Sequence, residues 1–274
     1  MLPMTKPSSA SNMEIMALLR QLARDQAVVR MLNIYKGLPI SYDTYVYAVG
    51  ASEIQMPSSK NHIACLYHQG ETFLQGDTLP VVIRSKVTRL NLAKDFAILT
   101  NFEIVKNDIG KRMQIRVEPD EPLVATIQFR GSAYEFLAPV ADISANGASV
   151  YFDGDMFPSR LAQPGNELTM SISLPDSAAR KLRKAMPLPK IEGRKIASSL
   201  QTHLHGGQDR QGIVTAKGKI IAARHETASK RYHLNTQLTF KDPHRMVLLQ
   251  YISQRQTEII HDLRILSEDL YHNK

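Results

Sequence analysis

The stretch EFLAPVADISANGASVYF, residues 135–152, decides the fold that the C-terminal half of this chain is expected to adopt. Two runs rich in β-branched and aromatic residues flank the segment DISANG, residues 142–147, which is typical of a β-hairpin turn. In such a turn Gly147 can take a positive φ, and the side chains of Asp142 and Ser144 can accept hydrogen bonds from turn amides. The pattern therefore predicts strands at about 135–143 and 148–152.

Further strand-like runs lie on both sides of this hairpin, at about residues 123–129, 167–174, 213–223 and 232–240. The strand pattern lapses between residues 176 and 212. There we expect a short basic helix at about 176–186 and a long loop, which together form an insertion. After residue 243, apolar residues recur at helical spacing as far as Leu270, which predicts a long C-terminal helix.

The N-terminal half has the same strand-rich texture after an initial helix. We expect residues 1–12 to be disordered and a helix to run from Met13 to about Asn33, with a break near Asp25. Turn signals near 56–59, 69–71 and 75–77 suit a small antiparallel barrel rather than βαβ units. The short strands expected there include runs at residues 44–49, 62–67, 81–83 and 96–99.

The predicted fold class is therefore mainly β, with two small antiparallel β-barrels, an N-terminal helix and a long C-terminal helix. The expected organisation, in chain order, is a disordered start and helix (1–37), an N-terminal split barrel (38–105), a linker (106–116), a second barrel (117–256, with its insertion at 176–212) and a C-terminal helix (257–274).

Composition narrows the possible partners and sites. The 274 residues carry a formal net charge of +8, which favours an anionic partner such as a nucleotide, a nucleic acid, phospholipid headgroups or an acidic protein surface. Cys65 is the only cysteine, so an internal disulfide and a cysteine-rich zinc site are excluded. No stretch approaches the roughly 20 apolar residues that cross a bilayer, and no signal-peptide pattern is present. We therefore expect a cytoplasmic protein.

The other residue groups that could form a metal site or a catalytic site are weak candidates. We do not expect a metal site at His62, Cys65 and His68, or at His203 and His205, because neither set provides a complete ligand arrangement. No nucleophile, base and orienting group can be assembled from the sequence, so we expect a protein that is not an enzyme and needs no cofactor or metal.

Two arginines four residues apart, Arg112 and Arg116 in RMQIR, lie between the expected linker and the first strand of the second barrel. A guanidinium is a planar fork of donors that can bind phosphate oxygens or the O6/N7 edge of guanine. Asp and Ser oxygens in the turn at 142–147 could accept hydrogen bonds from guanine N1–H or N2–H. Each element alone also fits a structural explanation, as solvated arginines and as a hairpin turn.

The order of these elements resembles the PilZ family, in which an RxxxR segment is followed by a strand pair and a (D/N)xSxxG turn. The resemblance covers about residues 109–255 and implies that the chain binds cyclic di-GMP. It assigns guanine and phosphate contacts to Arg112 and Arg116, and a guanine contact to Asp142, Ser144 and Gly147. With Lys111 and Asn146, the candidate ligand-binding residues are Lys111, Arg112, Arg116, Asp142, Ser144, Asn146 and Gly147.

The N-terminal half is similar to the split barrel that precedes PilZ in proteins of the flagellar-brake type. This resemblance implies a receptor in which ligand binding orders the linker and reorients the two barrels. Lys111, directly before the first arginine, hints at two stacked ligand molecules. The implied output is regulation of motility, attachment or exopolysaccharide through contact with a protein of the flagellar, pilus or polysaccharide machinery, and the terminal helix could pair two copies.

Two alternatives stay open. One is a basic β-barrel that binds single-stranded nucleic acid, with Tyr134, Tyr151 and Tyr232 as stacking residues. The other is a PilZ-like scaffold that acts through protein contacts without the ligand. Two departures from the family pattern are the insertion and the segment TQLTF at 236–240, where the family often has a glycine, so we expect no site residue in that last strand.

Overall fold

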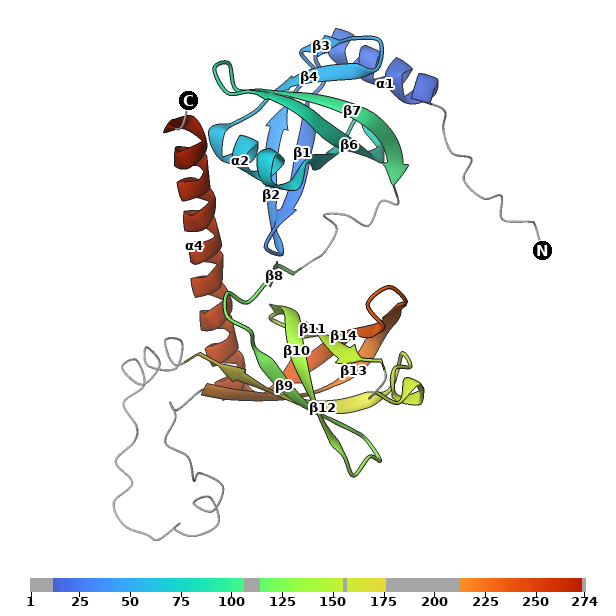
Figure 1. Ribbon diagram of the computed structural model, residues 1–274, viewed down its shortest axis with the longest axis vertical. Coiled ribbons are helices and arrows are strands. Elements are labelled where there is room, and N and C mark those ends of the chain that lie inside the picture. The colour runs from blue at the N-terminus through green and yellow to red at the C-terminus, as the bar shows by residue number, and fades with distance from the viewer. Residues whose placement is uncertain (1–11, 106–113, 155–156, 176–211, 273–274) are drawn as a thin grey trace, which may run out of the picture. The chain divides into compact units, whose positions relative to one another are not determined.

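The computed structural model describes residues 12–105, 114–154, 157–175 and 212–272, and it divides into two compact units. One unit comprises residues up to 115 together with those from 257 onward, and the other comprises residues 116–256. The predicted fold class is confirmed, because the chain is mainly β and has a short N-terminal and a long C-terminal helix (Figure 1).

All strands of the first unit and its first two helices precede the expected linker. They are α1 (Asn12–Arg24), β1 (Val29–Tyr35), β2 (Leu38–Thr44), β3 (Ala48–Val49), β4 (Glu53–Pro57), α2 (Lys60–Gln69), β5 (Glu71–Gly76), β6 (Leu79–Asn91) and β7 (Phe96–Val105). Their antiparallel sheet has the order β2-β1-β5-β6-β7-β4-β3. Helix α1 contributes a buried apolar face, including Leu19 and Leu22, to the core of this sheet because its apolar residues recur every three to four positions.

The second unit is a closed six-stranded barrel with a short edge strand. Its elements are β8 (Arg116–Val117), β9 (Val124–Phe129), β10 (Glu135–Ser144), β11 (Gly147–Asp153), a 3₁₀ turn (Ser159–Leu161), β12 (Glu167–Leu174), β13 (Gly212–Glu226) and β14 (Arg231–Phe240). The strand order is β11-β14-β13-β12-β9-β10-β8, and the additional pairing of β10 with β11 closes the ring. The expected strands of this half are confirmed within a few residues.

Strand β10 closes the barrel because its two halves pair with different neighbours. Residues 135–139 pair with β9, and residues 140–144 pair with β11 after a register shift between Val140 and Asp142. Such a bulge bends a strand and increases its twist, which lets one strand serve two sides of the ring. The end of β10 also pairs with β8 through Ser144 and Arg116. This pairing brings the second arginine of the RxxxR segment beside the hairpin.

Alternation along the barrel strands separates an apolar interior from a polar outer face. In β12 the residues from Leu168 to Leu174 are buried at every second position. Aromatic rings of Phe129, Phe136, Phe152 and Phe157 pack together, with the closest pair, Phe152 and Phe157, stacked at 4.2 Å between centroids.

The expected strand at 62–67 is wrong, because these residues lie in helix α2. The side chain of Ser59 accepts a hydrogen bond from the amide of His62, and Gly70 ends the helix with a left-handed φ of 68°. Ser or Thr before a helix and Gly after it are strong boundary signals. Here they outweigh the aromatic and β-branched residues that suggested a strand.

The N-terminal helix ends at the break expected near Asp25 and does not continue to Asn33. It ends at Arg24, Gln26 takes a left-handed φ of 48°, and β1 begins at Val29. The expected strand at 44–49 is also divided, since β2 ends at Thr44 and β3 begins only at Ala48. Between Thr44 and Ala48 the aromatic and β-branched residues continue across the interruption, and no Gly or Pro marks it.

The predicted C-terminal helix is confirmed as α4 (Asp242–His272). In the first unit its residue Asp262 accepts a hydrogen bond from Lys36 Nζ at 2.6 Å, and Ile259 and Leu263 are buried. Within the described residues no helix is long and apolar enough to span a membrane. Lys111, Arg112, most of the expected linker, nearly all of the 176–212 insertion and the expected disordered start lie outside the described residues.

Candidate functional site

A hydrogen-bonded cluster around Arg116 occupies the outer face of the barrel. Arg116 Nη1 donates to Asp142 Oδ1 at 3.1 Å and to Ser149 Oγ at 3.0 Å. Ser149 Oγ lies 3.0 Å from Asp142 Oδ1 and 2.7 Å from Asn235 Oδ1. The side chains of Arg116 and Asp142 keep 22% and 20% of their exposure, so the ion pair is partly desolvated and still open to a ligand.

The cluster has more acceptors than protons to satisfy them. A hydroxyl carries one proton, so Ser149 can donate either to Asp142 or to Asn235 at a given moment, but not to both. One acceptor therefore remains available for an N–H donor. Among the described residues, the hydrogen bonds of the Arg116 guanidinium use Nη1 alone, which leaves the Nε and Nη2 protons for an acceptor.

This combination selects a particular kind of partner. A group that presents two N–H donors beside two acceptors matches the free oxygen and the free guanidinium protons. Guanine has this pattern, with N1–H and N2–H on one edge and O6 and N7 on the other. A phosphate would satisfy the arginine but not the surplus acceptor.

The hairpin turn that follows Asp142 is built tightly. Ser144 pairs with Gly147 across a two-residue loop, and Ser144 Oγ donates to the Gly147 carbonyl oxygen at 3.1 Å. Ser144 is only 4% exposed, whereas Asn146 is exposed. The Ser144 hydroxyl therefore stabilises the turn in this structure, and its remaining lone pairs are almost covered.

Gly147 has a different structural role from the one expected. Its φ is not positive; instead, a Cβ at this position would lie 2.4 Å from the carbonyl oxygen of Thr236 on β14. The absence of a side chain lets β11 and β14 approach, and Thr236 Oγ1 donates to the Ala148 carbonyl oxygen at 2.7 Å. The expectation of a positive φ at Gly147 is wrong, because the close approach of the strands is what requires glycine.

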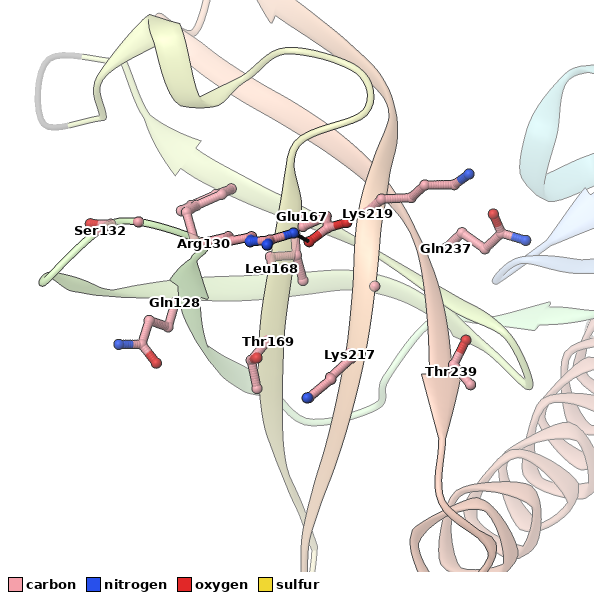
Figure 2. Close-up of a pocket in the computed structure, with 13 residues that line it drawn as sticks. Gln128, Arg130, Ser132, Glu167, Leu168, Thr169, Lys217, Lys219, Gln237 and Thr239 are labelled. Carbon is pink, nitrogen blue, oxygen red and sulfur yellow. Dashed lines mark hydrogen bonds and ion pairs between the residues drawn. The ribbon is translucent and has the colours of Figure 1, made fainter.

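A groove of about 890 Å³ lies on the same outer face of the barrel (Figure 2). Strands β9, β12, β13 and β14 and the loop after β9 supply its walls, and the polar residues among them are Gln128, Arg130, Ser132, Glu167, Thr169, Lys217, Lys219, Gln237 and Thr239. Strand β14 connects the groove to the Arg116 cluster, because Asn235 and Gln237 lie two residues apart and so face the same side.

Several residues of this surface were missed by the sequence analysis: Ser149, Lys219, Asn235 and Gln237. Asn235 and Gln237 belong to the last strand, for which no site residue was expected, and they lie beside the cluster and the groove. Polar residues at every second position from 235 to 239 were the available signal, since they mark one outward face of a strand. Their proximity to Asp142 depends on strand register, which the sequence does not give.

The tyrosines of the nucleic-acid alternative are partly engaged within the barrel. Tyr151 stacks on His233 with 4.7 Å between centroids, and Tyr232 contacts His225 at 4.7 Å. Tyr134, which is 75% exposed, is not among the residues that line the groove.

The histidines and cysteine of the first unit form no metal site in the part of the chain that the structure describes, where no group of three His, Cys, Asp or Glu side chains could hold an ion. Burial raises the pKa of the Cys65 thiol to about 12, so it stays protonated. His203 and His205 lie outside the described residues.

Comparison with known proteins gives matches to solved structures only. No model of a known protein family matches the chain, and neither does any curated protein. Similar structures include K. pneumonia MrkH in complex with c-di-GMP (12% identity, 93% of this chain and 96% of that chain, TM-score 0.38). Others are Escherichia coli YcgR in complex with c-di-GMP (10%, 94% and 96%, 0.39) and Bacillus subtilis MotI/DgrA, an inhibitor of motility (14%, 84% and 96%, 0.37). At these identities and TM-scores, the assignment of function depends on the residues of the site itself.

Proposed function

We propose that this chain is a receptor for cyclic di-GMP and that its C-terminal barrel binds the dinucleotide at the Arg116 cluster. The observation that carries the proposal is the contact of Arg116 with Asp142 and Ser149. This contact joins the RxxxR segment to the DxSxxG turn, two elements 26 residues apart, in one partly open cluster. The cluster's free donors and surplus acceptor match the edges of guanine.

Each candidate residue has a distinct role in this proposal. Arg116 donates to O6 and N7 of a guanine or to a phosphate oxygen, while Asp142 accepts from N1–H or N2–H. Ser144 and Gly147 shape the turn, and exposed Asn146 offers an amide beside it. By the motif spacing, Arg112 and Lys111 contribute further cationic contacts.

Binding is expected to act as a switch rather than as the start of a reaction. In the proposed mechanism the ligand fixes the RxxxR segment and changes the orientation of the two barrels, because only differential contact with two states can shift their populations. The output would be contact with a protein of the motility, attachment or exopolysaccharide machinery. The ligand-independent scaffold is the alternative in which that contact occurs without the nucleotide.

Calorimetric titration with cyclic di-GMP tests the proposal. Arg116→Ala and Asp142→Ala should each weaken binding by tenfold or more, which corresponds to about 1.4 kcal/mol. Arg224→Ala is the matched control, because Arg224 is an exposed arginine on β13 that does not line the groove. Arg224→Ala removes the same positive charge as Arg116→Ala and should change the affinity less than about twofold.

Two results would reject the proposal. The first is a wild-type protein that does not bind cyclic di-GMP. The second is an equal loss of affinity in Arg116→Ala and Arg224→Ala, which would indicate a general effect of charge. Salt-dependent binding of single-stranded DNA, without binding of the dinucleotide, would support the nucleic-acid alternative.

A further inference from the structure

One row of paired residues crosses the barrel's outer face from the hairpin turn to the groove. Gly147 on β11 pairs with Gln237 on β14, and Gln237 pairs with Lys219 on β13. Neighbouring strands lie about 4.8 Å apart, so the backbones of Gly147 and Lys219 are about 10 Å apart. A nucleotide with its base at the turn therefore has its phosphate within reach of a long side chain from Lys219.

Lys219 has a charge that its described neighbours do not neutralise. Glu167, which pairs with Lys219 across the strands, already accepts from Arg130 Nη1 at 2.6 Å. Within the part of the chain that the structure describes, the Lys219 amine makes no ion pair or hydrogen bond. Arg130 and Glu167 balance each other, so Lys217 and Lys219 give the groove its excess positive charge.

The two lysines differ in direction although they share a strand and an outer face. Figure 2 shows the Lys219 side chain extending toward the side of Gln237 on β14, whereas the Lys217 side chain extends toward the side of Thr169 on β12. Lys219 thus extends toward the strand that pairs with Gly147, and Lys217 extends away from it.

We infer that Lys219 is a phosphate-binding residue of the ligand site, and that the site extends from the Arg116 cluster into the groove as far as β13. The inference rests on the proposed function and adds a residue that neither the RxxxR segment nor the turn contains. An ammonium group is a compact charge that binds phosphate oxygens without needing the planar geometry of an arginine. With Arg116 on a guanine, Lys219 would contact a phosphodiester of the same dinucleotide.

Three variants of the full chain test this inference by calorimetry with cyclic di-GMP. Lys219→Ala should raise the Kd about fivefold to twentyfold, as expected for the loss of one charge-assisted hydrogen bond. Lys217→Ala, which removes the same charge from the same strand, should change the Kd less than about twofold. Lys219→Arg should bind within about threefold of the wild type, because it keeps a cationic donor.

The outcomes separate this inference from the proposed function. Wild-type binding that Arg116→Ala weakens and Lys219→Ala does not would overturn the role of Lys219 and leave the receptor proposal intact. Equal losses in Lys219→Ala and Lys217→Ala would also overturn it, because they would reflect only the net charge. A wild type that does not bind would overturn both proposals. Both lysines are exposed, so melting temperatures close to that of the wild type are expected for all three variants.

Discussion

Gly147→Ala tests the role that the structure gives to the turn glycine. A Cβ at residue 147 would lie 2.4 Å from the Thr236 carbonyl oxygen, about 1 Å closer than ordinary van der Waals contact. The obstructing atom belongs to the backbone of β14 and cannot rotate away. The two strands must therefore separate where Gly147 pairs with Gln237.

The contacts at this point of the barrel set the loss in the free energy of unfolding that Gly147→Ala causes. Overpacking a tight site costs about 1–3 kcal/mol. The bond from the Leu238 amide to the Asn146 carbonyl oxygen, at 2.8 Å, lies beside the clash and is worth about 1 kcal/mol. Alanine loses less backbone entropy on folding than glycine, which returns about 0.4–1 kcal/mol. We therefore expect Gly147→Ala to lower the free energy of unfolding by about 1–3.5 kcal/mol.

Urea denaturation of the ligand-free protein measures this change. Gly50→Ala is the control, since a Cβ there would be tight only against the flexible Glu53 side chain at 3.1 Å and would lie at an ordinary 3.6 Å from the Glu53 carbonyl oxygen. A change below about 0.5 kcal/mol is expected. A Gly147→Ala protein as stable as the wild type, with ligand binding alone impaired, would refute the argument. It would show that the glycine serves the ligand rather than the packing of β11 and β14.

Three further predictions concern stability and the Arg116 cluster. Burial lowers the pKa of His62 to about 4, so protonation below pH 6.5 favours the unfolded chain, and the free energy of unfolding should fall by about 2 kcal/mol from pH 7.5 to 5. Denaturation of His62→Gln should show a correspondingly smaller loss over the same pH range. A pH dependence in this variant that equals that of the wild type would contradict the assignment to His62. Arg255 is 3% exposed and its Nε donates to the Glu118 carbonyl oxygen at 2.9 Å; Arg255→Leu should cost about 2–3 kcal/mol in urea denaturation, and a neutral result would count against the bond. Ser149→Ala removes the hydroxyl shared within the cluster and should weaken cyclic di-GMP binding about threefold to tenfold by calorimetry; unchanged affinity would exclude its participation.

The sequence was most informative where alternation and turn residues agreed. The strands of the second unit follow the polar and apolar alternation within a few residues, because the interior of a small barrel accepts only every second side chain. The first unit was harder. Residues 62–67 have strand-like composition, yet Ser59 and Gly70 cap a helix around them. Capping geometry therefore outweighed intrinsic strand preference.

The candidate site could be predicted only in part. Motif order identified Arg116 and Asp142, and the structure brings them into contact. Ser149, Asn235 and Lys219 could not be found in this way, since their positions depend on the register of β11, β13 and β14. A shift of one residue in that register would turn each of these side chains to the opposite face.

Discrimination between cyclic di-GMP and cyclic di-AMP tests the central claim most directly. Adenine keeps the N7 acceptor, but it has an N6–H2 donor in place of the O6 acceptor and has no N1–H or N2–H donor. An Arg116 N–H would therefore face another donor, and the surplus oxygen of the cluster would lose the N1–H and N2–H donors that guanine offers. Calorimetry of the wild-type chain should therefore show binding of cyclic di-GMP at least about 100-fold tighter than that of cyclic di-AMP, a difference of about 2.7 kcal/mol. Equal affinity for the two dinucleotides would contradict guanine recognition by Arg116 and Asp142.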